Sequence, residues 1–257
     1  MSIPFTKYHG TGNDFVLIDN RQDVFNHNDT ALVAAMCNRR FGVGADGLIL
    51  LEHHSEYDFT MVYFNADGNP SSMCGNGGRC IVHFANQLGI VQGDVRFMAV
   101  DGLHTATIDG DIISLKMADV KSAKIADGYS FLDTGSPHHV IFTEQIDSID
   151  VKTQGAAIRY GLYGEQGANV NFVQQIDVTN FKVRTYERGV EDETYSCGTG
   201  VTAVALAAFQ NKLTDKTNLK LHTPGGLLSV RFKDKGVGFT NVHLIGPAMA
   251  VYTGVWE

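Results

Sequence analysis

Two cysteines in this chain occupy a pattern that suits proton-transfer chemistry. Cys74 lies in "MCGNGGRC" and Cys197 in "SCGTGVTAVALAAF", so each thiol stands on a glycine-rich turn before an apolar helical pattern. A helix N-terminus presents unpaired N–H groups and the positive end of the helix dipole, and a cysteine placed there has a lowered pKa. The same N–H groups bind carboxylates. Each turn therefore predicts a reactive thiol beside an anion-binding site.

Together, the two cysteines favour an acid–base pair. A thiolate on one face of a carbon can remove its proton while a thiol on the opposite face supplies one, which inverts the stereocentre. Such a pair titrates jointly, because one thiolate disfavours a second one nearby. A purely structural role for the turns explains their glycines but not a thiol in each. We therefore interpret Cys74 and Cys197 as catalytic.

The spacing of the two motifs recurs along the chain. Cys197 follows Cys74 by 123 positions (197 − 74 = 123), nearly half of the 257 residues. The same offset relates further pairs with similar neighbours: Gly12 and Gly135, Gly44 and Gly167, Tyr63 and Tyr186, and Gly102 and Gly225. One offset without gaps indicates an internal duplication.

The duplication and the strand patterns together predict the fold. Short β-branched and aromatic segments outnumber helical ones, and the Asp-Gly turn in "HTATIDGDIISLKM" predicts a hairpin. We predict an α+β fold of two pseudo-symmetric halves, each an antiparallel sheet or barrel around a central helix that begins at a cysteine. The predicted halves are residues 1–120 and 121–247, with a strand at about 248–257 returning to the first half. We expect the active site in the cleft between the halves.

Composition excludes several classes of partner. A net charge of -8 without basic clusters argues against nucleic acid and anionic membranes. The longest apolar stretch, 201–209, is too short to span a bilayer, and no signal peptide is evident. Four cysteines are too few for a disulfide framework and lack zinc-site spacing, so we expect no metal, and thiols in a reducing cytosol. Cys37 and Cys80 are expected in the core.

Five motifs resemble those of the diaminopimelate epimerase family, from about Phe5 to the C-terminus: "HGTGNDFVLID", "YFNADG", "MCGNGGRC", "ANVNF" and "YERGVEDETYSCGTG". The resemblance implies a cofactor-independent isomerase that interconverts LL- and meso-2,6-diaminopimelate, an amino-acid biosynthesis step toward lysine and cell wall. It also implies a cytoplasmic homodimer whose other partner is this small-molecule substrate.

The resemblance also implies roles for residues at matching positions. It makes Cys74 and Cys197 the acid–base pair, commonly written with the first as donor and the second as acceptor, and the roles exchange with reaction direction. The backbone of four residues would hold the reacting α-carboxylate: Gly75, Asn76, Gly198 and Thr199. Four side chains would line the pocket: Asn13, Asn65, Asn169 and Arg188. Glu187 would bind an ammonium group, and Glu187 and His138 are candidates for tuning the thiol pKa values.

The chain departs from the family pattern at three places. Ser136 stands where the family has asparagine, in "GSPH". Position 47 is glycine where some members have a substrate-binding glutamine, so no side chain acts there. The loop "ERGVEDETYSCG" is one residue longer than usual, which affects the acids at 191–193 but not Cys197.

Three other functions remain as alternatives. A proline or hydroxyproline racemase would use the same thiol pair on a smaller substrate, but Glu187, Arg188 and three asparagines favour a substrate with a second charged end. A cysteine hydrolase using His138 would leave one motif cysteine idle and would form an acyl-enzyme. A non-catalytic amino-acid-binding protein would lose little affinity with serine at both cysteine positions.

Overall fold

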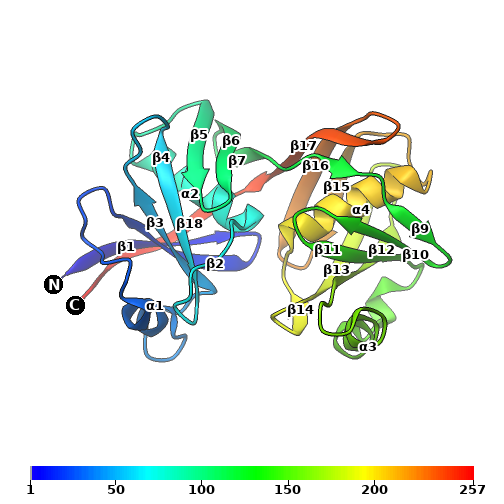
Figure 1. The fold of residues 1–257 in the computed structure, drawn as a ribbon, viewed down its shortest axis with the longest axis horizontal. Coiled ribbons are helices and arrows are strands. Elements are labelled where there is room, and N and C mark those ends of the chain that lie inside the picture. Colours follow the sequence, from blue (N-terminus) through cyan, green and yellow to red (C-terminus); the bar gives the residue numbers. More distant parts are fainter. Residues whose placement is uncertain (1) are drawn as a thin grey trace. The chain divides into compact units, whose positions relative to one another are not determined.

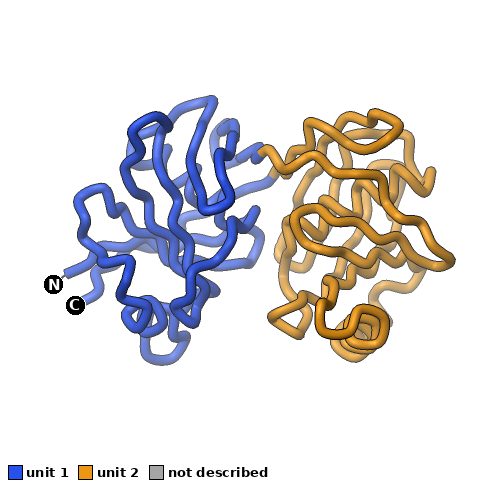
Figure 2. The backbone as a smooth tube through the Cα atoms, viewed as in Figure 1, with its two compact units in different colours: residues 1–115, 246–257 blue, residues 116–245 orange. Residues whose placement is uncertain are grey.

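The computed structural model describes residues 2–257, which form two compact units. Unit 1 consists of residues 1–115 and 246–257, and unit 2 of residues 116–245 (Figure 2). The chain therefore leaves unit 1 once and returns to it with its last strand. Within residues 2–257, no helix has the length and apolar character needed to cross a bilayer.

Unit 1 contains two helices and eight strands among the described residues (Figure 1). In chain order they are β1 (Ile3–Gly10), β2 (Asn13–Asp19), α1 (Thr30–Cys37), β3 (Gly47–Glu52), β4 (Phe59–Asn65), α2 (Gly75–Gln87), β5 (Asp94–Ala99), β6 (Gly102–Asp109), β7 (Ile112–Lys116) and β18 (Met249–Trp256). Strand β1 pairs antiparallel with both β2 and β18. Parallel pairs join β2 to β3 and β4 to β5, whereas β3–β4, β5–β6 and β6–β7 are antiparallel.

Unit 2 repeats much of this succession. Its elements are β8 (Val120–Lys121), β9 (Lys124–Ala126), β10 (Tyr129–Asp133), β11 (Pro137–Phe142), the 3-10 helix η1 (Ile146–Ser148), α3 (Val151–Tyr163), β12 (Asn169–Gln175), β13 (Asn180–Glu187), β14 (Asp192–Thr194), α4 (Gly198–Gln210), β15 (Asn218–Thr223), β16 (Gly226–Asp234) and β17 (Gly238–Pro247). Strands β11 and β12 are parallel, as are β13 and β15, whereas β12–β13 and β15–β16 are antiparallel.

The fold is α+β, and its sheets are mixed where we predicted antiparallel ones. Every parallel pair named above is joined by a crossover through a helix: α1 between β2 and β3, α2 between β4 and β5, α3 between β11 and β12, and α4 between β13 and β15. A strand that returns through a helix arrives in the same direction, so these pairings are parallel. The predicted Asp-Gly hairpin does form, between β6 and β7, with Gly110 at φ 57°.

The two thiol-bearing helices begin where the glycine turns predict. Cys74 is the N-cap of α2 and Cys197 the N-cap of α4, both with extended backbone. Each helix has 13 residues. Every residue of α4 from 201 to 208 is fully buried, and α4 contacts strands β10, β11, β12, β13, β15 and β16 (Figure 1). An apolar helix enclosed by strands is held by burial, at about 1.5–3 kcal/mol for each large aliphatic side chain.

Two glycines in α3 give a test of this packing. A Cβ at Gly155 would lie 2.4 Å from the Tyr186 Cβ, whereas a Cβ at Gly161 meets nothing within 4 Å. We expect Gly155→Ala to lower the free energy of unfolding by about 1–3 kcal/mol through overpacking. Gly161→Ala, the matched control, should raise it by up to about 1 kcal/mol, because alanine favours the helix. Urea unfolding of the full chain measures both, and equal effects would contradict the described contact of α3 with β13.

Candidate active site

The thiol of Cys74 lies at the first turn of α2 beside the β1–β2 hairpin. The first intrahelical hydrogen bond runs from the Gly78 N–H to the Cys74 carbonyl, 2.7 Å, so the N–H groups of residues 75–77 precede the helical ladder. The Cys74 Sγ donates to the Asn13 Oδ1 at 3.6 Å. A Cβ at Gly77 would lie 3.0 Å from Ile49, so glycine lets this turn approach β3 closely.

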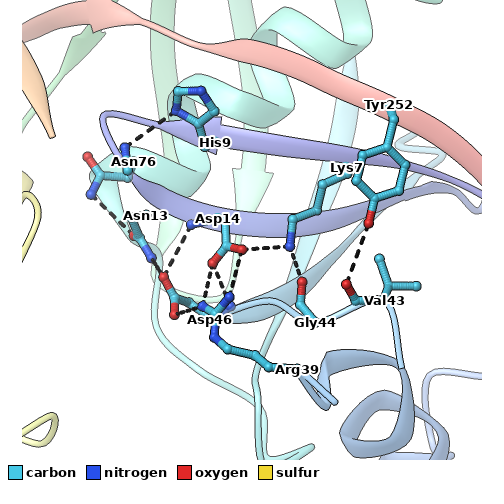
Figure 3. A network of polar contacts seen from close by, with 11 residues as sticks. Lys7, His9, Asn13, Asp14, Arg39, Val43, Gly44, Asp46, Asn76 and Tyr252 are labelled. Atoms are coloured by element: carbon cyan, nitrogen blue, oxygen red, sulfur yellow. Dashed lines mark hydrogen bonds and ion pairs between the residues drawn. The ribbon is translucent and has the colours of Figure 1, made fainter. Parts of the chain in front are cut away.

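Asn13 also belongs to a network of charged side chains that includes Asp46, Asp14 and Arg39 (Figure 3). Its Nδ2 donates to the Asp46 carboxylate at 2.6 Å, and its Oδ1 accepts from the Asn76 Nδ2 at 3.2 Å. Arg39 binds Asp46 at 2.6 Å and holds Asp14 through two hydrogen bonds of 3.0 and 2.7 Å. The chain of polar contacts thus runs from an arginine, through a carboxylate and an amide, to the thiol.

Asp14 and the buried Lys7 complete this network. The Lys7 Nζ lies 2.6 Å from the Asp14 carboxylate and also donates to the Gly44 carbonyl. Burial alone would raise the pKa of Asp14, but hydrogen bonds and charge from Arg39 and Lys7 outweigh it and lower this pKa to about 2. Asp14 therefore stays ionised at neutral pH.

A fully buried arginine, Arg79, lies one turn into α2. Its guanidinium donates to the Thr11 Oγ1, the Asn76 Oδ1, and the carbonyls of Gly75 and Pro247. No carboxylate among residues 2–257 forms an ion pair with it. Burial lowers its pKa, while the thiols of Cys80 and Cys74 act in the opposite direction. An uncompensated buried cation close to Cys74 favours a negative charge there.

The thiol of Cys197 has different neighbours, and those described here belong to unit 2. Its Sγ lies 3.4 Å from the Thr199 Oγ1, which lies 2.9 Å from the His138 Nε2. The other ring nitrogen of His138, Nδ1, lies 3.1 Å from the Asn171 Nδ2. Burial, with a smaller contribution from the Arg188 charge, lowers the pKa of His138 to about 3, so this imidazole is neutral at pH 7.

Four further predicted residues fall near the two motifs or at strand ends. Asn169 is buried, and its side chain contacts Ser136, the Pro137 carbonyl and the Arg188 N–H. Arg188 and Asn65 are exposed, and Glu187, half-buried, ends β13. Ser136, at the family's asparagine position, accepts from the Asn169 Nδ2 at 2.9 Å. Unit 2 therefore gathers Ser136, His138, Asn169 and Thr199, whereas unit 1 gathers Asn13, Cys74, Gly75 and Asn76.

The other departures from the family pattern have structural explanations. A Cβ at Gly47 would lie 2.5 Å from the Tyr63 ring, so that ring fills the space a side chain would take. In the longer loop, the three acids form ion pairs within unit 2: Glu191 with Arg159, Asp192 with Lys152 and Glu193 with Arg184. These acids hold the loop against α3 and β13.

The remaining cysteines lie in the core, as expected. Cys37 and Cys80 are buried and burial raises the pKa of both, that of Cys37 to about 12. No disulfide joins any of the four cysteines. Among the described residues, no three His, Cys, Asp or Glu side chains are grouped to hold a metal ion. The site residues that sequence reasoning missed are Asp46, Arg79 and Asn171. Arg79 and Asn171 lie inside motifs noted above, and Asp46 lies next to the glycine at position 47.

Comparison with known proteins identifies the family. The family model described as diaminopimelate epimerase matches residues 5–121 and 130–250. A diaminopimelate epimerase of Flavobacterium psychrophilum is 55% identical over 96% of this chain and 97% of its own. That of Chlorobaculum tepidum is 43% identical over 95% of this chain and 98% of its own. The chain belongs to the diaminopimelate epimerase family.

Solved structures show the same fold at much lower sequence identity. A phenazine biosynthesis protein of the PhzF family from Bacillus anthracis matches with a TM-score of 0.78 at 12% identity, over 100% of this chain and 99% of its own. A hydroxyproline epimerase from Agrobacterium vitis matches with a TM-score of 0.69 at 12% identity, over 99% of this chain and 92% of the epimerase chain. At this identity the likeness concerns the fold. This member of the diaminopimelate epimerase family thus has a fold shared with other enzyme families.

The network around Asp14 predicts a pH-dependent stability. Because the pKa of Asp14 falls from its usual value near 3.8 to about 2 in the folded chain, ionised Asp14 stabilises the fold above about pH 4. This contribution, about 2 kcal/mol, is lost as pH falls through 2. We expect Asp14→Asn to lower the free energy of unfolding by about 2 kcal/mol at pH 7 and by much less near pH 2.

The control for this prediction is Asp19→Asn. Asp19 pairs with Arg21 at 2.7 Å near the surface of the same unit, where an ion pair contributes less than about 1 kcal/mol. Denaturant unfolding from pH 2 to 8 measures both variants. A loss for Asp14→Asn that does not change with pH would show that its carboxylate acts through packing alone.

Proposed function

We propose that this protein interconverts LL- and meso-2,6-diaminopimelate by two-thiol proton transfer, without a cofactor. The observation that carries the proposal is that two helices, α2 and α4, each begin at a cysteine on a glycine turn. Membership of the diaminopimelate epimerase family gives the substrate. The role of each residue follows from the chemistry that its position allows.

The first requirement of the reaction is to stabilise the α-carbanion. Loss of the α-proton places negative charge on the adjacent carboxylate, and N–H groups at a helix start stabilise that charge. We assign this role to the backbone at Gly75 and Asn76 in α2 and at Gly198 and Thr199 in α4. Glycines at these turns let a carboxylate approach the backbone.

The second requirement is a base and an acid on opposite faces of the α-carbon. The thiolate takes the α-proton and becomes a thiol, and the other thiol gives its proton to the opposite face and becomes a thiolate. The product therefore leaves the two cysteines with exchanged protonation states. In the reverse direction they exchange roles. We assign these roles to Cys74 and Cys197.

The third requirement is to recognise the distal, non-reacting amino acid end. Arg188 suits the distal carboxylate, because its guanidinium binds a carboxylate with two hydrogen bonds. Glu187 suits an ammonium group, and the amides of Asn13, Asn65 and Asn169 serve either. Proline has no second charged end, so this set favours diaminopimelate over a proline-type substrate. His138 and Glu187 are further proposed to tune the thiols.

Two wider features belong to the same proposal. The cytoplasm, a reducing compartment, suits a mechanism that needs both cysteines as thiols. A homodimer, proposed by analogy with the family, finds support in β18, where Met249, Val251, Tyr252 and Val255 are each exposed by 46–57%. A strand with several exposed apolar side chains is a candidate contact surface.

The central prediction concerns exchange of the α-proton. Incubated in D2O with LL-diaminopimelate, the parent should incorporate deuterium at one α-carbon and form the meso isomer. We expect Cys74→Ala and Cys197→Ala each to lower inversion by about 10²–10⁴-fold, because one of the two proton transfers is lost. Each variant retains one thiol, so it should at most exchange the α-proton of the one isomer in which that proton faces the remaining thiol. Mass spectrometry and optical rotation measure the two readouts.

Cys37→Ala is the matched control, since Cys37 is a buried thiol in α1 outside both motifs, and it should turn over like the parent. A parent that exchanges no α-proton refutes the mechanism. A parent that inverts proline as readily as diaminopimelate refutes only the substrate. An acyl-enzyme trapped at either cysteine would instead favour a hydrolase.

The homodimer predicts a response at β18. Val251→Glu and Val255→Glu together place two charges among the exposed apolar side chains, and we expect them to convert a dimer into a monomer. Sedimentation equilibrium at several protein concentrations measures the mass. Val237→Glu is the control, because Val237 is also exposed but lies in unit 2, outside β18. A monomeric parent would refute the homodimer and leave the chemistry untouched.

A further inference from the structure

The hydrogen bonds around Cys74 have a defined direction. An ionised carboxylate only accepts hydrogen bonds, so Asp46, which is ion-paired with Arg39, requires the Asn13 Nδ2 to face it, at 2.6 Å. The Asn13 Oδ1 then faces the Cys74 sulfur at 3.6 Å. Because this oxygen only accepts, the sulfur must be the donor. The contact stabilises Cys74 in its protonated state.

The hydrogen bonds that reach Asn13 from Arg79 require the same orientation of the Asn13 amide. Arg79 only donates, and its guanidinium holds the Asn76 Oδ1 at 3.0 Å. This places the Asn76 Nδ2 against the Asn13 Oδ1 at 3.2 Å. Two groups of fixed polarity, Arg79 and Asp46, thus agree on the orientation of the Asn13 amide. That orientation follows from chemistry and not only from the placement of two similar atoms.

The hydrogen bonds around Cys197 run the other way. The Asn171 Nδ2 donates to the backbone carbonyl of His139 at 3.1 Å, and a carbonyl only accepts. Its Oδ1 accepts from the Thr185 hydroxyl at 3.0 Å. Asn171 therefore presents an N–H to the His138 Nδ1. Since His138 is neutral, its Nδ1 is the acceptor and its Nε2 carries the proton.

Further hydrogen bonds connect His138 to the sulfur of Cys197. The His138 Nε2–H donates to the Thr199 Oγ1 at 2.9 Å, which leaves the hydroxyl proton of Thr199 directed to the Cys197 Sγ at 3.4 Å. The Asn169 Nδ2 also lies 3.5 Å from the His138 Nε2, but its two hydrogens are engaged by Ser136 and the Pro137 carbonyl at 2.9 and 3.2 Å. A hydroxyl that donates to sulfur stabilises the thiolate.

We propose that Asp46 and Asn171 are positioning residues that set opposite hydrogen-bond directions at the two cysteines, so that the resting protein holds Cys74 as the thiol and Cys197 as the thiolate. The inference rests on the proposed function, for which it supplies one acid and one base before substrate binds. Neither residue touches the reacting carbon. Each acts through an amide or an imidazole that it orients.

Charged groups near these two series of hydrogen bonds also affect the protons of Cys74 and Cys197. In unit 1, the charged and titratable groups on α2 and the segments packed against it include Lys7, Tyr8, His9, Asp14, Asp19, Arg39, Asp46, Glu52, Arg79, Cys80, His83, His104, Asp109 and Asp111. In unit 2, those beside the His138 chain are His139, Tyr163, Glu187 and Arg188. Lys7 and Arg39 balance Asp14 and Asp46. Arg79, which has no carboxylate partner among residues 2–257, favours a thiolate at Cys74, and the Asn13 oxygen holds the proton against it.

The test is the pH dependence of thiol alkylation by iodoacetamide, followed on the cysteine-containing peptides by mass spectrometry. Each thiol is measured with the other replaced by alanine, which removes their coupling. We expect Cys197 to be half-ionised at a lower pH than Cys74. Asp46→Asn should lower the midpoint of Cys74 by up to about 1 pH unit. Arg39 keeps the oxygen of the new amide, whose NH2 then faces the Asn13 Nδ2, so that Asn76 becomes the remaining group that holds the Asn13 oxygen toward the sulfur. Thr199→Val should raise the midpoint of Cys197 similarly.

At pH 7 a shift of 1 unit at the mainly protonated Cys74 corresponds to about threefold faster alkylation, because the thiolate fraction rises about tenfold and the accompanying loss of nucleophilicity offsets about a factor of three. For Cys197, which is mainly thiolate at pH 7, the readout is the shift of the midpoint itself. Thr199→Ser keeps the hydroxyl and should restore the parent profile. Asp19→Asn removes a comparable carboxylate from the Arg21 pair in the same unit and should leave both profiles unchanged.

Two measurements separate hydrogen-bond direction from charge and from misfolding. If the lower midpoint of Cys74 in Asp46→Asn persists in 1 M salt, the orientation of the Asn13 amide is its cause. If salt abolishes the shift, the loss of the Asp46 charge alone explains it, and the proposal is overturned. In the parent, ¹⁵N chemical shifts should show the proton of His138 on Nε2. A proton on Nδ1, or a lower midpoint for Cys74 than for Cys197, also overturns it. None of these readouts needs turnover, so they stand apart from failure of the proposed epimerase activity.

Discussion

The start of a buried helix is the constraint on which the rest of this structure depends. A helix leaves its first N–H groups without intrahelical partners, and burying such a start is costly unless something accepts from them. Both α2 and α4 begin at a cysteine and run into a core enclosed by strands. Their glycine turns keep side chains out of the way, as at Gly200, where a Cβ would lie 2.6 Å from the Asn171 oxygen. The fold therefore supplies two places that favour an anion.

Charge near these helix starts is handled differently in the two units. In unit 1, the buried Lys7 is matched by Asp14, whereas the partners of the Arg79 guanidinium among residues 2–257 are neutral oxygens. Neutral partners satisfy its N–H groups and leave its charge uncompensated, so the field at Cys74 stays positive. In unit 2, the Thr199 hydroxyl links the thiol to a neutral imidazole, because burial keeps His138 unprotonated. One thiol thus faces a fixed cation, and the other a polar chain without net charge.

Much of this was predictable from sequence, and the reasons for the rest are physical. Glycine turns before apolar runs predict the starts of α2 and α4, and an Asp-Gly pair predicts the β6–β7 hairpin, because these signals are local. The parallel pairs β2–β3 and β11–β12 were missed because strand direction depends on the helix between the strands. Asp46 and Asn171 were missed because their effect lies in which atom of an amide faces which neighbour, and no spacing in the sequence encodes that.

The 123-residue offset shows where the two halves differ in a way that matters. His138 and Asn171 stand opposite Phe15 and Leu48, both fully buried core residues in unit 1, and Thr199 stands opposite Asn76. The imidazole and the amide of unit 2 thus occupy positions that are apolar in unit 1. In unit 2 they belong to a series of hydrogen-bond donors that ends at the Cys197 sulfur, whereas in unit 1 the Cys74 sulfur meets an amide oxygen. Two identical thiol sites would compete equally for one proton. The proposed stereoinverting pair needs one acid and one base, and these different core residues give the two thiols the unlike hydrogen-bond partners from which we infer that asymmetry.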